Sequence, residues 1–380
     1  MKNCCYIFLS LLLLISLSAC APDASGVKTN TCTIDSTQLV KIPMSSEMIN
    51  SYKATQLIEQ DGREKMVAYN DIMHGIDVID LEQKAMTDFV RLKKEGPEKI
   101  AKVRGFYYVN KDSVFVFTDF KIFLIDMEGD FKQVIEVNSE RSKINGLDFS
   151  EYVLSVNQKK GRPVYFDRNT NFLYFPLRYY RYDQNTIPEH YARENSLCGR
   201  LNINTLKFEK LDIHYPDIFR EKSFGLLSSP NFLFLEDKII YNFKTSSKIY
   251  VYDIASGRTA VKEAPSAYAP KEAEAYYGST GAGDEQIHHV TNNPEYREFK
   301  YIPERRQYYR AVINTHPTKA RRKLSYFTVL DENFNVLTDF ELPPYHFPIG
   351  ALPSKQGLMC YVTNVPEQAT AFRVFRTQCD

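Results

Sequence analysis

The amino-acid sequence predicts an all-β protein, a six-bladed β-propeller closed by an N-terminal strand that completes the last blade. Three observations carry this prediction. A phrase of four short apolar strands recurs along the 380 residues. Its second strand begins near residues 65, 113, 171, 238, 307 and 357, and a four-stranded unit at this spacing is typical of propeller blades. The sixth unit lacks a fourth strand, and one spare strand lies near the N-terminus.

Each complete unit consists of four predicted strands, named a, b, c and d in chain order, with tight turns between a and b and between c and d. Asp, Gly, Asn and Pro occupy these turns, as at Glu236-Asp237 and Ser256-Gly257 of the fourth unit. The six units span residues 55–92, 104–137, 163–211, 231–263, 297–342 and 349–377.

The spare strand, at 35–44, matches the one strand that the sixth unit lacks. In a ring it would pair with the last unit, tie the two ends of the chain together and remove free sheet edges. A seventh blade would need a further unit, which the sequence does not contain. We therefore expect residues 35–380 to form one propeller domain.

The N-terminus has the features of a targeting segment. Lys2 is followed by an apolar run at 6–18 that is too short for a membrane-spanning helix. The run ends in Leu-Ser-Ala-Cys, which resembles the bacterial lipobox, and this resemblance implies cleavage of residues 1–19 and a lipid on Cys20. We expect residues 20–34 to be a flexible tether and the lipid to be the contact with the membrane. The expected location is the cell envelope, at the outer membrane of a Gram-negative bacterium, on either side.

Four cysteines would remain after processing, in an oxidising compartment where disulfides form. They allow three pairings, and the sequence does not choose among them. These residues are Cys32, Cys198, Cys360 and Cys379.

The overall composition excludes one class of partner. The chain has 48 Lys and Arg against 47 Asp and Glu, so it lacks the basic bias of nucleic-acid-binding proteins. Two short basic runs, at 305–310 and 319–323, lie in different parts of the fifth unit, and we expect both to be solvent-exposed faces.

Long segments occur only in the d–a and b–c connections, which share one face of a propeller. Long loops on a rigid scaffold commonly carry binding residues. Three arginines lie at or just before strand a, the channel-lining strand, and two more lie in the long b–c insertion of the third unit. We predict a cationic funnel mouth that binds carboxylate or phosphate, with a tyrosine able to stack on a sugar or peptide. The alternative is a solvated or salt-bridged rim. The candidate residues are Arg104, Arg162, Arg178, Tyr180, Arg181, His288 and Arg297.

Catalytic signatures are missing from the sequence. It contains no G-x-S-x-G, H-E-x-x-H or phosphate-binding G-x-x-x-x-G-K motif, and no Trp of the kind that sialidase-like propellers repeat. We expect no cofactor, no metal and no catalysis, and we favour a propeller that binds a glycan, a peptide or an envelope protein. The alternative is a propeller enzyme, either a glycan-active hydrolase or lyase or a metal-dependent lactonase-like hydrolase.

The stretch LKKEGPEKIAKVRGFYYVNKDSVFVF at 92–117 carries a resemblance to a known group of proteins. It is similar to the linker-and-blade phrase of six-bladed propeller lipoproteins of Bacteroides-type bacteria, in a domain-of-unknown-function family related to NHL and TolB-like propellers. The resemblance covers about residues 35–380 and implies the propeller fold. It carries over no catalytic residue.

Overall fold

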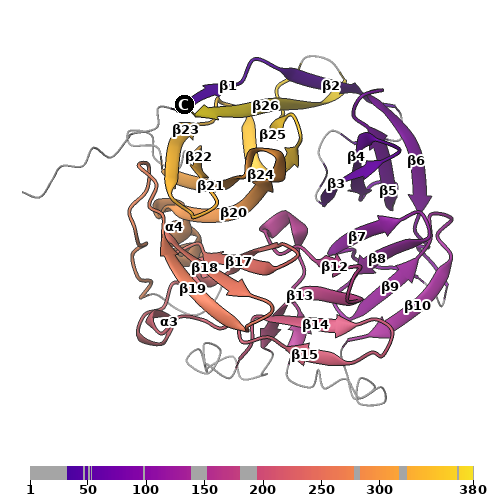
Figure 1. The fold of residues 1–380 in the computed structure, drawn as a ribbon, viewed down its shortest axis with the longest axis horizontal. Helices are drawn as coiled ribbons and strands as arrows, with labels where there is room; N and C mark the ends of the chain where they lie inside the picture. Colours follow the sequence, from indigo (N-terminus) through magenta and orange to yellow (C-terminus); the bar gives the residue numbers. More distant parts are fainter. Residues whose placement is uncertain are drawn as a thin grey trace, which may run out of the picture.

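The protein is described from a computed structural model. The residues it describes are 32–45, 48–49, 52, 54–96, 99–137, 152–179, 195–277, 283–315, 323–365 and 368–379. Six antiparallel sheets stand around a central axis and form a closed ring, and both described ends of the chain lie in the same sheet (Figure 1). The predicted six-bladed β-propeller is confirmed.

The blades follow the order of the predicted units. The strands of blades one to three are β3 (Thr55–Gln60), β4 (Arg63–Asn70), β5 (Gly75–Asp80), β6 (Ala85–Arg91), β7 (Gly105–Asn110), β8 (Ser113–Phe117), β9 (Lys121–Ile125), β10 (Phe131–Glu136), β11 (Tyr152–Leu154), β12 (Tyr165–Asp167), β13 (Phe172–Tyr179), β14 (Cys198–Asn202) and β15 (Phe208–Lys210).

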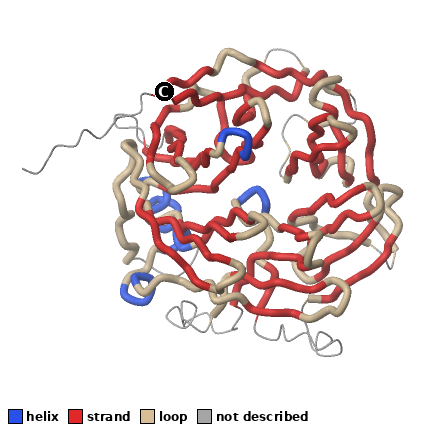
Figure 2. The backbone as a smooth tube through the Cα atoms, in the orientation of Figure 1, coloured by secondary structure: helices blue, strands red, loops and turns tan. Residues whose placement is uncertain are grey.

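The remaining strands form blades four to six, and the short helices lie in the connections (Figure 2). These elements are β16 (Pro230–Phe234), β17 (Lys238–Phe243), β18 (Lys248–Asp253), β19 (Arg258–Glu263), β20 (Glu295–Ile302), β21 (Gln307–Thr315), β22 (Lys323–Leu330), β23 (Val336–Glu341), β24 (His346–Ser354), β25 (Gly357–Val362), β26 (Ala369–Cys379), β1 (Cys32–Asp35), β2 (Leu39–Pro43), α3 (Ile218–Glu221), α4 (Asp284–Asn292), η2 (Gln158–Lys160), η3 (Gly225–Ser228) and η4 (Pro303–Arg305).

Blade four shows why these segments become strands. β17 is mostly apolar and buried from Ile239 to Phe243, whereas every residue of the outer strand β19 is exposed. Tyr241 of β17 stacks on Tyr250 of β18, with ring centroids 5.0 Å apart. Such cross-strand aromatic pairs stabilise a sheet beyond the area that they bury. Gly257 has a φ of 67° in the turn between β18 and β19, a conformation that glycine adopts without a steric cost.

Blade six closes the ring. β1 and β2 pair antiparallel with the outer edge of β26, so an N-terminal segment completes the blade as predicted. Strand pairing begins at Cys32, three residues before the expected domain start, because Cys32 lies opposite Cys379 and forms a disulfide with it. The residues 32–34 therefore belong to the sheet rather than to the tether. Cys198 and Cys360 are free thiols in the core.

The inner strand of blade three differs from the prediction. It begins at Tyr152, eleven residues before the expected start, and it is interrupted between β11 and β12. Both pieces pair with β13, and residues 155–164 leave the sheet between them. This excursion, called here the channel hairpin, is closed by paired backbone bonds between Asn157 and Arg162 and carries η2 at its tip.

One basic run is not the solvent-exposed face that the sequence suggested. Arg310 is fully buried, donates hydrogen bonds to the backbone oxygens of Ser247 and Ala264, and lies over the rings of Tyr296 and Phe299. Carbonyl groups and aromatic faces thus replace water around the guanidinium group, and the side chain ties blade four to blade five.

No helix among the described residues is both long enough and apolar enough to cross a membrane.

Candidate functional site

The channel hairpin inserts its tip into the centre of the ring. Gln158 donates to and accepts from the backbone of Phe106 in β7 of blade two, at 2.8 and 3.1 Å. On the other side, Gly161 accepts a hydrogen bond from the backbone N–H of Phe232 in blade four, and η2 also contacts β24 of blade six. Three other blades therefore hold the tip in place.

Gly161 is required at the tip of the channel hairpin. Its φ is 70°, and a Cβ atom at this position would lie 2.6 Å from the side-chain oxygen of Asn231. Only a residue without a side chain permits both the turn and the close approach of the hairpin to blade four.

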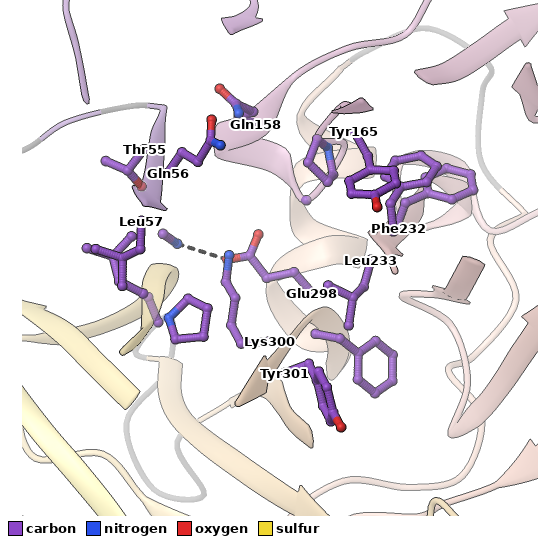
Figure 3. Close-up of a pocket in the computed structure, with 18 of the residues that line it drawn as sticks. Thr55, Gln56, Leu57, Gln158, Tyr165, Phe232, Leu233, Glu298, Lys300 and Tyr301 are labelled. Carbon is purple, nitrogen blue, oxygen red and sulfur yellow. Dashed lines mark hydrogen bonds and ion pairs between the residues drawn. The ribbon is translucent and has the colours of Figure 1, made fainter. Parts of the chain in front are cut away.

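A cavity of about 380 Å³ runs along the axis below this tip. It is lined by residues from the inner strands of all six blades, from Thr55 at the long-loop end to Pro303 and Pro353 at the a–b turns (Figure 3). Aromatic side chains make up much of the wall, namely Tyr107, Tyr165, Phe232, Phe234, Phe299 and Tyr301.

Two charged side chains lie among these apolar walls. Glu298 is 4% exposed, accepts a hydrogen bond of 2.9 Å from the backbone N–H of Gly350, and forms an ion pair of 3.5 Å with Lys300. Figure 3 shows the two side chains between Leu57 and Leu233. The pair gives the cavity hydrogen-bonding groups with no net charge.

The cavity wall is also stabilised by amide groups. The inner edge of β7 has no neighbouring strand, so its backbone needs other partners. Gln56 pairs with the backbone of Tyr108 at 2.8 and 3.0 Å, and Gln158 pairs with that of Phe106 in the same way. These two side chains pair with the backbone of the edge as a neighbouring strand would, and so satisfy its hydrogen-bonding groups.

A second group of charges lies at the other side of the channel hairpin, where blades three, four and five meet. Glu295, at the start of β20, is 2% exposed. Its carboxylate forms ion pairs with Lys244 at 3.8 Å, Arg297 at 2.8 Å and Lys323 at 2.7 Å. The backbone oxygen of Lys244 accepts a hydrogen bond from the N–H of Tyr296, which fixes the blades in register.

Arg162 adds a fourth cation to this group. Its positive charge and that of Arg297 both lower the pKa of Lys244, so the three side chains lie within electrostatic reach of one another. Arg162 donates to Ser155 at 2.6 Å, and among the described residues no carboxylate lies within ion-pair distance of it. We call Arg162, Lys244, Glu295, Arg297 and Lys323 the Glu295 cluster.

Burial and charge shift the pKa values in this cluster. Desolvation, and then the nearby Arg297 guanidinium, lower the pKa of Lys244 to about 8. Burial opposes ionisation of Glu295, but its three cationic neighbours outweigh that effect and hold its pKa below the ordinary value. Burial and the repulsion from Arg178 lower the pKa of Arg162. The cluster thus holds more positive charge than its single carboxylate neutralises.

The predicted site residues are only partly brought together. Arg162 and Arg297 lie in the cluster, and Arg178 and Arg104 lie within electrostatic range of Arg162. The guanidinium group of Arg104 already pairs with Asp119 through two hydrogen bonds of 2.7 and 2.9 Å, as in the salt-bridged rim that was the alternative.

The other predicted residues do not join the group. His288 lies on α4, away from the centre of the ring, with its exposed side chain hydrogen-bonded to Asn292 (Figure 1). Tyr180 and Arg181 lie outside the described residues.

Sequence reasoning missed Lys244 and Glu295, as well as Glu298 and Lys300 in the cavity. Lys323 was assigned to the solvent-exposed basic run 319–323, but it pairs with the buried Glu295; the other residues of that run lie outside the described residues. Lys244 and Lys323 lie at strand ends, and the other three residues lie on strand a of blade five. Glu295 and Glu298 flank Arg297, and the signal available was the run of alternating charges EYREFK at 295–300. Among the described residues, no three metal-ligating side chains lie close enough together to hold a metal ion.

Comparison with known proteins agrees with this architecture. The crystal structure of a member of the DUF4221 family from Bacteroides vulgatus superposes with a TM-score of 0.80 at 17% identity, over 93% of this chain and 100% of that one. A structure described as a putative exported protein from Bacteroides fragilis superposes with a TM-score of 0.55 at 9% identity, over 92% of this chain and 95% of that one. At these identities the likeness shows the fold alone. No curated protein matches the chain.

The sequence also matches a family model directly. The match covers residues 30–339, most of the chain, and includes the linker-and-blade phrase at 92–117 on which the resemblance was noted. This chain therefore belongs to the family described as Domain of unknown function (DUF4221).

Proposed function

We propose that this protein is a binding lipoprotein of the cell envelope, and that its axial cavity holds one or two sugar residues of a glycan without chemical change. The observation that carries the proposal is the cavity itself. It is closed on one side by the channel hairpin, walled by aromatic rings, and supplied with one carboxylate and one ammonium group.

The size and chemistry of the cavity fit this ligand class. A volume of about 380 Å³ lies at the lower end of the range for small-molecule pockets. Aromatic faces pack against the apolar faces of sugar rings, and paired charged groups bind hydroxyls as acceptor and donor. The walls are anchored by Gln56 and Gln158, so little order has to be gained on binding.

The cavity gives less support to glycan hydrolysis. Glycosidases generally use two carboxyl groups on opposite sides of the bond that they break. Among the lining residues, all of which are described, Glu298 is the one carboxylate, and it is already held by Gly350 and Lys300. We therefore favour binding over the alternative of a propeller enzyme.

The envelope location rests on the lipobox-like segment that ends at Cys20 and on the exported character given to the Bacteroides fragilis relative. Replacing Cys20 with Ser should release the protein from the membrane fraction of expressing cells. Retention of the Cys20→Ser protein in that fraction would contradict lipid anchoring.

The ligand is best sought with a glycan array, followed by calorimetric titration of the oligosaccharide that binds. Tyr165→Ala and Glu298→Gln should each weaken its affinity about tenfold, because the first removes a stacking surface and the second replaces a charged acceptor oxygen with an amide NH2 group. Tyr277→Ala is the matched control, since Tyr277 is exposed and does not line the cavity.

Equal affinities of the cavity variants and the Tyr277→Ala control would contradict binding in the cavity. The bound oligosaccharide should be recovered unchanged after long incubation. Its conversion into a shorter or unsaturated product, detected by mass spectrometry, would replace the binding function with the enzymatic one.

A further inference from the structure

We propose that the Glu295 cluster is a second binding site, which takes a phosphate group of a small molecule on the long-loop side of the channel hairpin. This site goes beyond the proposed function and is independent of the axial cavity. Gln158, Gly161 and Pro163 line the cavity, whereas Arg162, in the same hairpin, belongs to the cluster. The hairpin therefore separates the two sites.

Three blades contribute the cations. Arg162 comes from the channel hairpin of blade three, Lys244 follows β17 of blade four, and Arg297 and Lys323 belong to β20 and β22 of blade five. Hydrogen bonds between backbone groups hold two of the junctions, from Phe232 to Gly161 and from Tyr296 to Lys244. The positions of the charged groups are thus set by the ring and not by flexible surface side chains.

The charge of this group is not balanced. Three cations pair with the Glu295 carboxylate, and Arg162 lies within electrostatic reach of one of them, Lys244. Among the described residues of the cluster this leaves more positive than negative charge, on groups that are mostly withdrawn from water. Lys244 is only 12% exposed in its side chain. The Nε atoms of Arg162 and Arg297 are buried, and neither has a hydrogen-bond partner among the described residues. Buried charges and donors of this kind are completed by an anion or by bound water, and the positive excess of the cluster favours an anion.

A phosphate group fits this arrangement better than a single carboxylate. It brings up to two negative charges and several acceptor oxygens, which matches two guanidinium groups with free Nε donors and one ammonium group. A carboxylate would leave a larger positive excess in a buried place. The two chemistries can be distinguished by using glucose 6-phosphate and galacturonate as separate probes.

The pH dependence gives the site a signature. Lys244 faces Arg162 and Lys160 from blade three and Glu295 and Arg297 from blade five, and Lys323 reaches it through Glu295. Sulfate serves as the probe because its charge does not change between pH 6 and 10. Its affinity should be constant below about pH 7 and fall about tenfold by pH 9.5, as the Lys244 ammonium loses its proton.

The test is calorimetric titration of the purified full-length chain with glucose 6-phosphate, galacturonate and sulfate. Lys244→Met and Arg162→Gln should each weaken glucose 6-phosphate binding at least about tenfold, and the fall of sulfate affinity with pH should vanish in Lys244→Met. Lys238→Met is the matched control, since Lys238 lies at the opposite end of β17. Circular dichroism establishes that each variant is folded, and two variants at different blades keep the test open if one does not fold.

Each result of these titrations either supports or overturns the proposed site. Saturable binding of glucose 6-phosphate that is lost in both cluster variants and kept in Lys238→Met supports the site. Tighter binding of galacturonate than of glucose 6-phosphate overturns the phosphate assignment. The absence of saturable binding for all three anions, or equal affinities in Lys244→Met and Lys238→Met, overturns the site itself. Neither result bears on glycan binding in the cavity, which Tyr165→Ala tests separately.

Discussion

Glu295 and Glu298 lie three residues apart on β20, and both are almost completely buried, yet they belong to opposite sides of the channel hairpin. Glu295 is surrounded by several cations and leaves an excess of positive charge. Glu298 has one lysine and one backbone N–H, and its surroundings are neutral and aromatic. One strand thus supplies two chemically different environments, because the channel hairpin divides the space in front of it.

The contrast between these two glutamates suggests how one propeller channel can present two chemically distinct sites. The inner strands provide the walls of both, so the ring sets the positions of all the charged groups. The channel hairpin lies between the two groups of charged side chains, because Gln158 and Gly161 line the cavity whereas Arg162 lies near Lys244. Changes to the ring should therefore disturb both the Glu295 cluster and the axial cavity. Changes to the cluster or to the channel hairpin should affect one of the two more than the other.

Opening the ring should have the largest effect on the free energy of unfolding, because the ring holds both the Glu295 cluster and the axial cavity in place. The disulfide between Cys32 and Cys379 closes a chain segment of 347 residues, and a cross-link over so long a loop removes much of the entropy of the unfolded chain. Replacing both cysteines with Ser should lower the free energy of unfolding by about 5 kcal/mol in denaturant titrations.

The control for the disulfide variant is Cys198→Ala, which removes a free buried thiol and should cost about 1 kcal/mol. Equal losses in the two proteins would mean that the disulfide does not hold the ring closed.

The two glutamates themselves provide the sharpest comparison. Glu295→Gln removes the only carboxylate of the cluster and leaves its buried cations unpaired, which should cost about 3 kcal/mol of stability. Glu298→Gln keeps an acceptor for the N–H of Gly350 and should cost about 1 kcal/mol. Thermal unfolding of both variants at low salt measures the difference, and a larger loss for Glu298→Gln would reverse our account of the two ends.

The free energy of unfolding should depend on pH through Lys244 of the Glu295 cluster. The pKa of Lys244 is lowered to about 8 from an ordinary value of 10.5, so its protonated form destabilises the folded state. This destabilisation is complete well below pH 8 and is relieved as the pH rises toward 10.5. From pH 7 to pH 9 the native protein should gain about 1 kcal/mol in unfolding free energy relative to Lys244→Met. Parallel pH profiles of the two proteins would exclude this shift.

The smallest effect should come from the tip of the channel hairpin. Gly161→Ala and Gly62→Ala both place a side chain at a positive φ, 70° and 73°, but only the first brings a Cβ atom against Asn231. Gly161→Ala should therefore be about 1 kcal/mol less stable than Gly62→Ala. It should also weaken glycan binding in the cavity, whereas Gly62→Ala should leave it unchanged. Equal stabilities would show that the hairpin tip shifts freely.

The blades could be predicted from the sequence because each is a local pattern. Alternating apolar strands and turn residues specify a hairpin without reference to distant residues, as Tyr250 and Gly257 do in blade four. The closing strand followed from counting strands. The pairing of Cys32 with Cys379 did not, because it depends on the register of β1 on β26, which four cysteines alone do not fix.

The site was less predictable because it depends on contacts between blades. Residues 155–164 have the composition of an ordinary loop, and only the three blades around it show that it enters the channel. Arg162 and Arg297 were identified from their position before strand a, but Lys244 comes from another blade and meets them only in the ring. Arg310 shows the same limit, because the carbonyl groups and rings that bury it are distant in the sequence.

The most direct test of the division of the channel is a crystal structure grown with selenate, an analogue of sulfate whose selenium atom is located by anomalous scattering. We predict one selenium peak between Arg162, Lys244 and Arg297, on the long-loop side of the channel hairpin, and none in the cavity beside Glu298. A peak in the axial cavity, or no peak at the Glu295 cluster, would contradict the account.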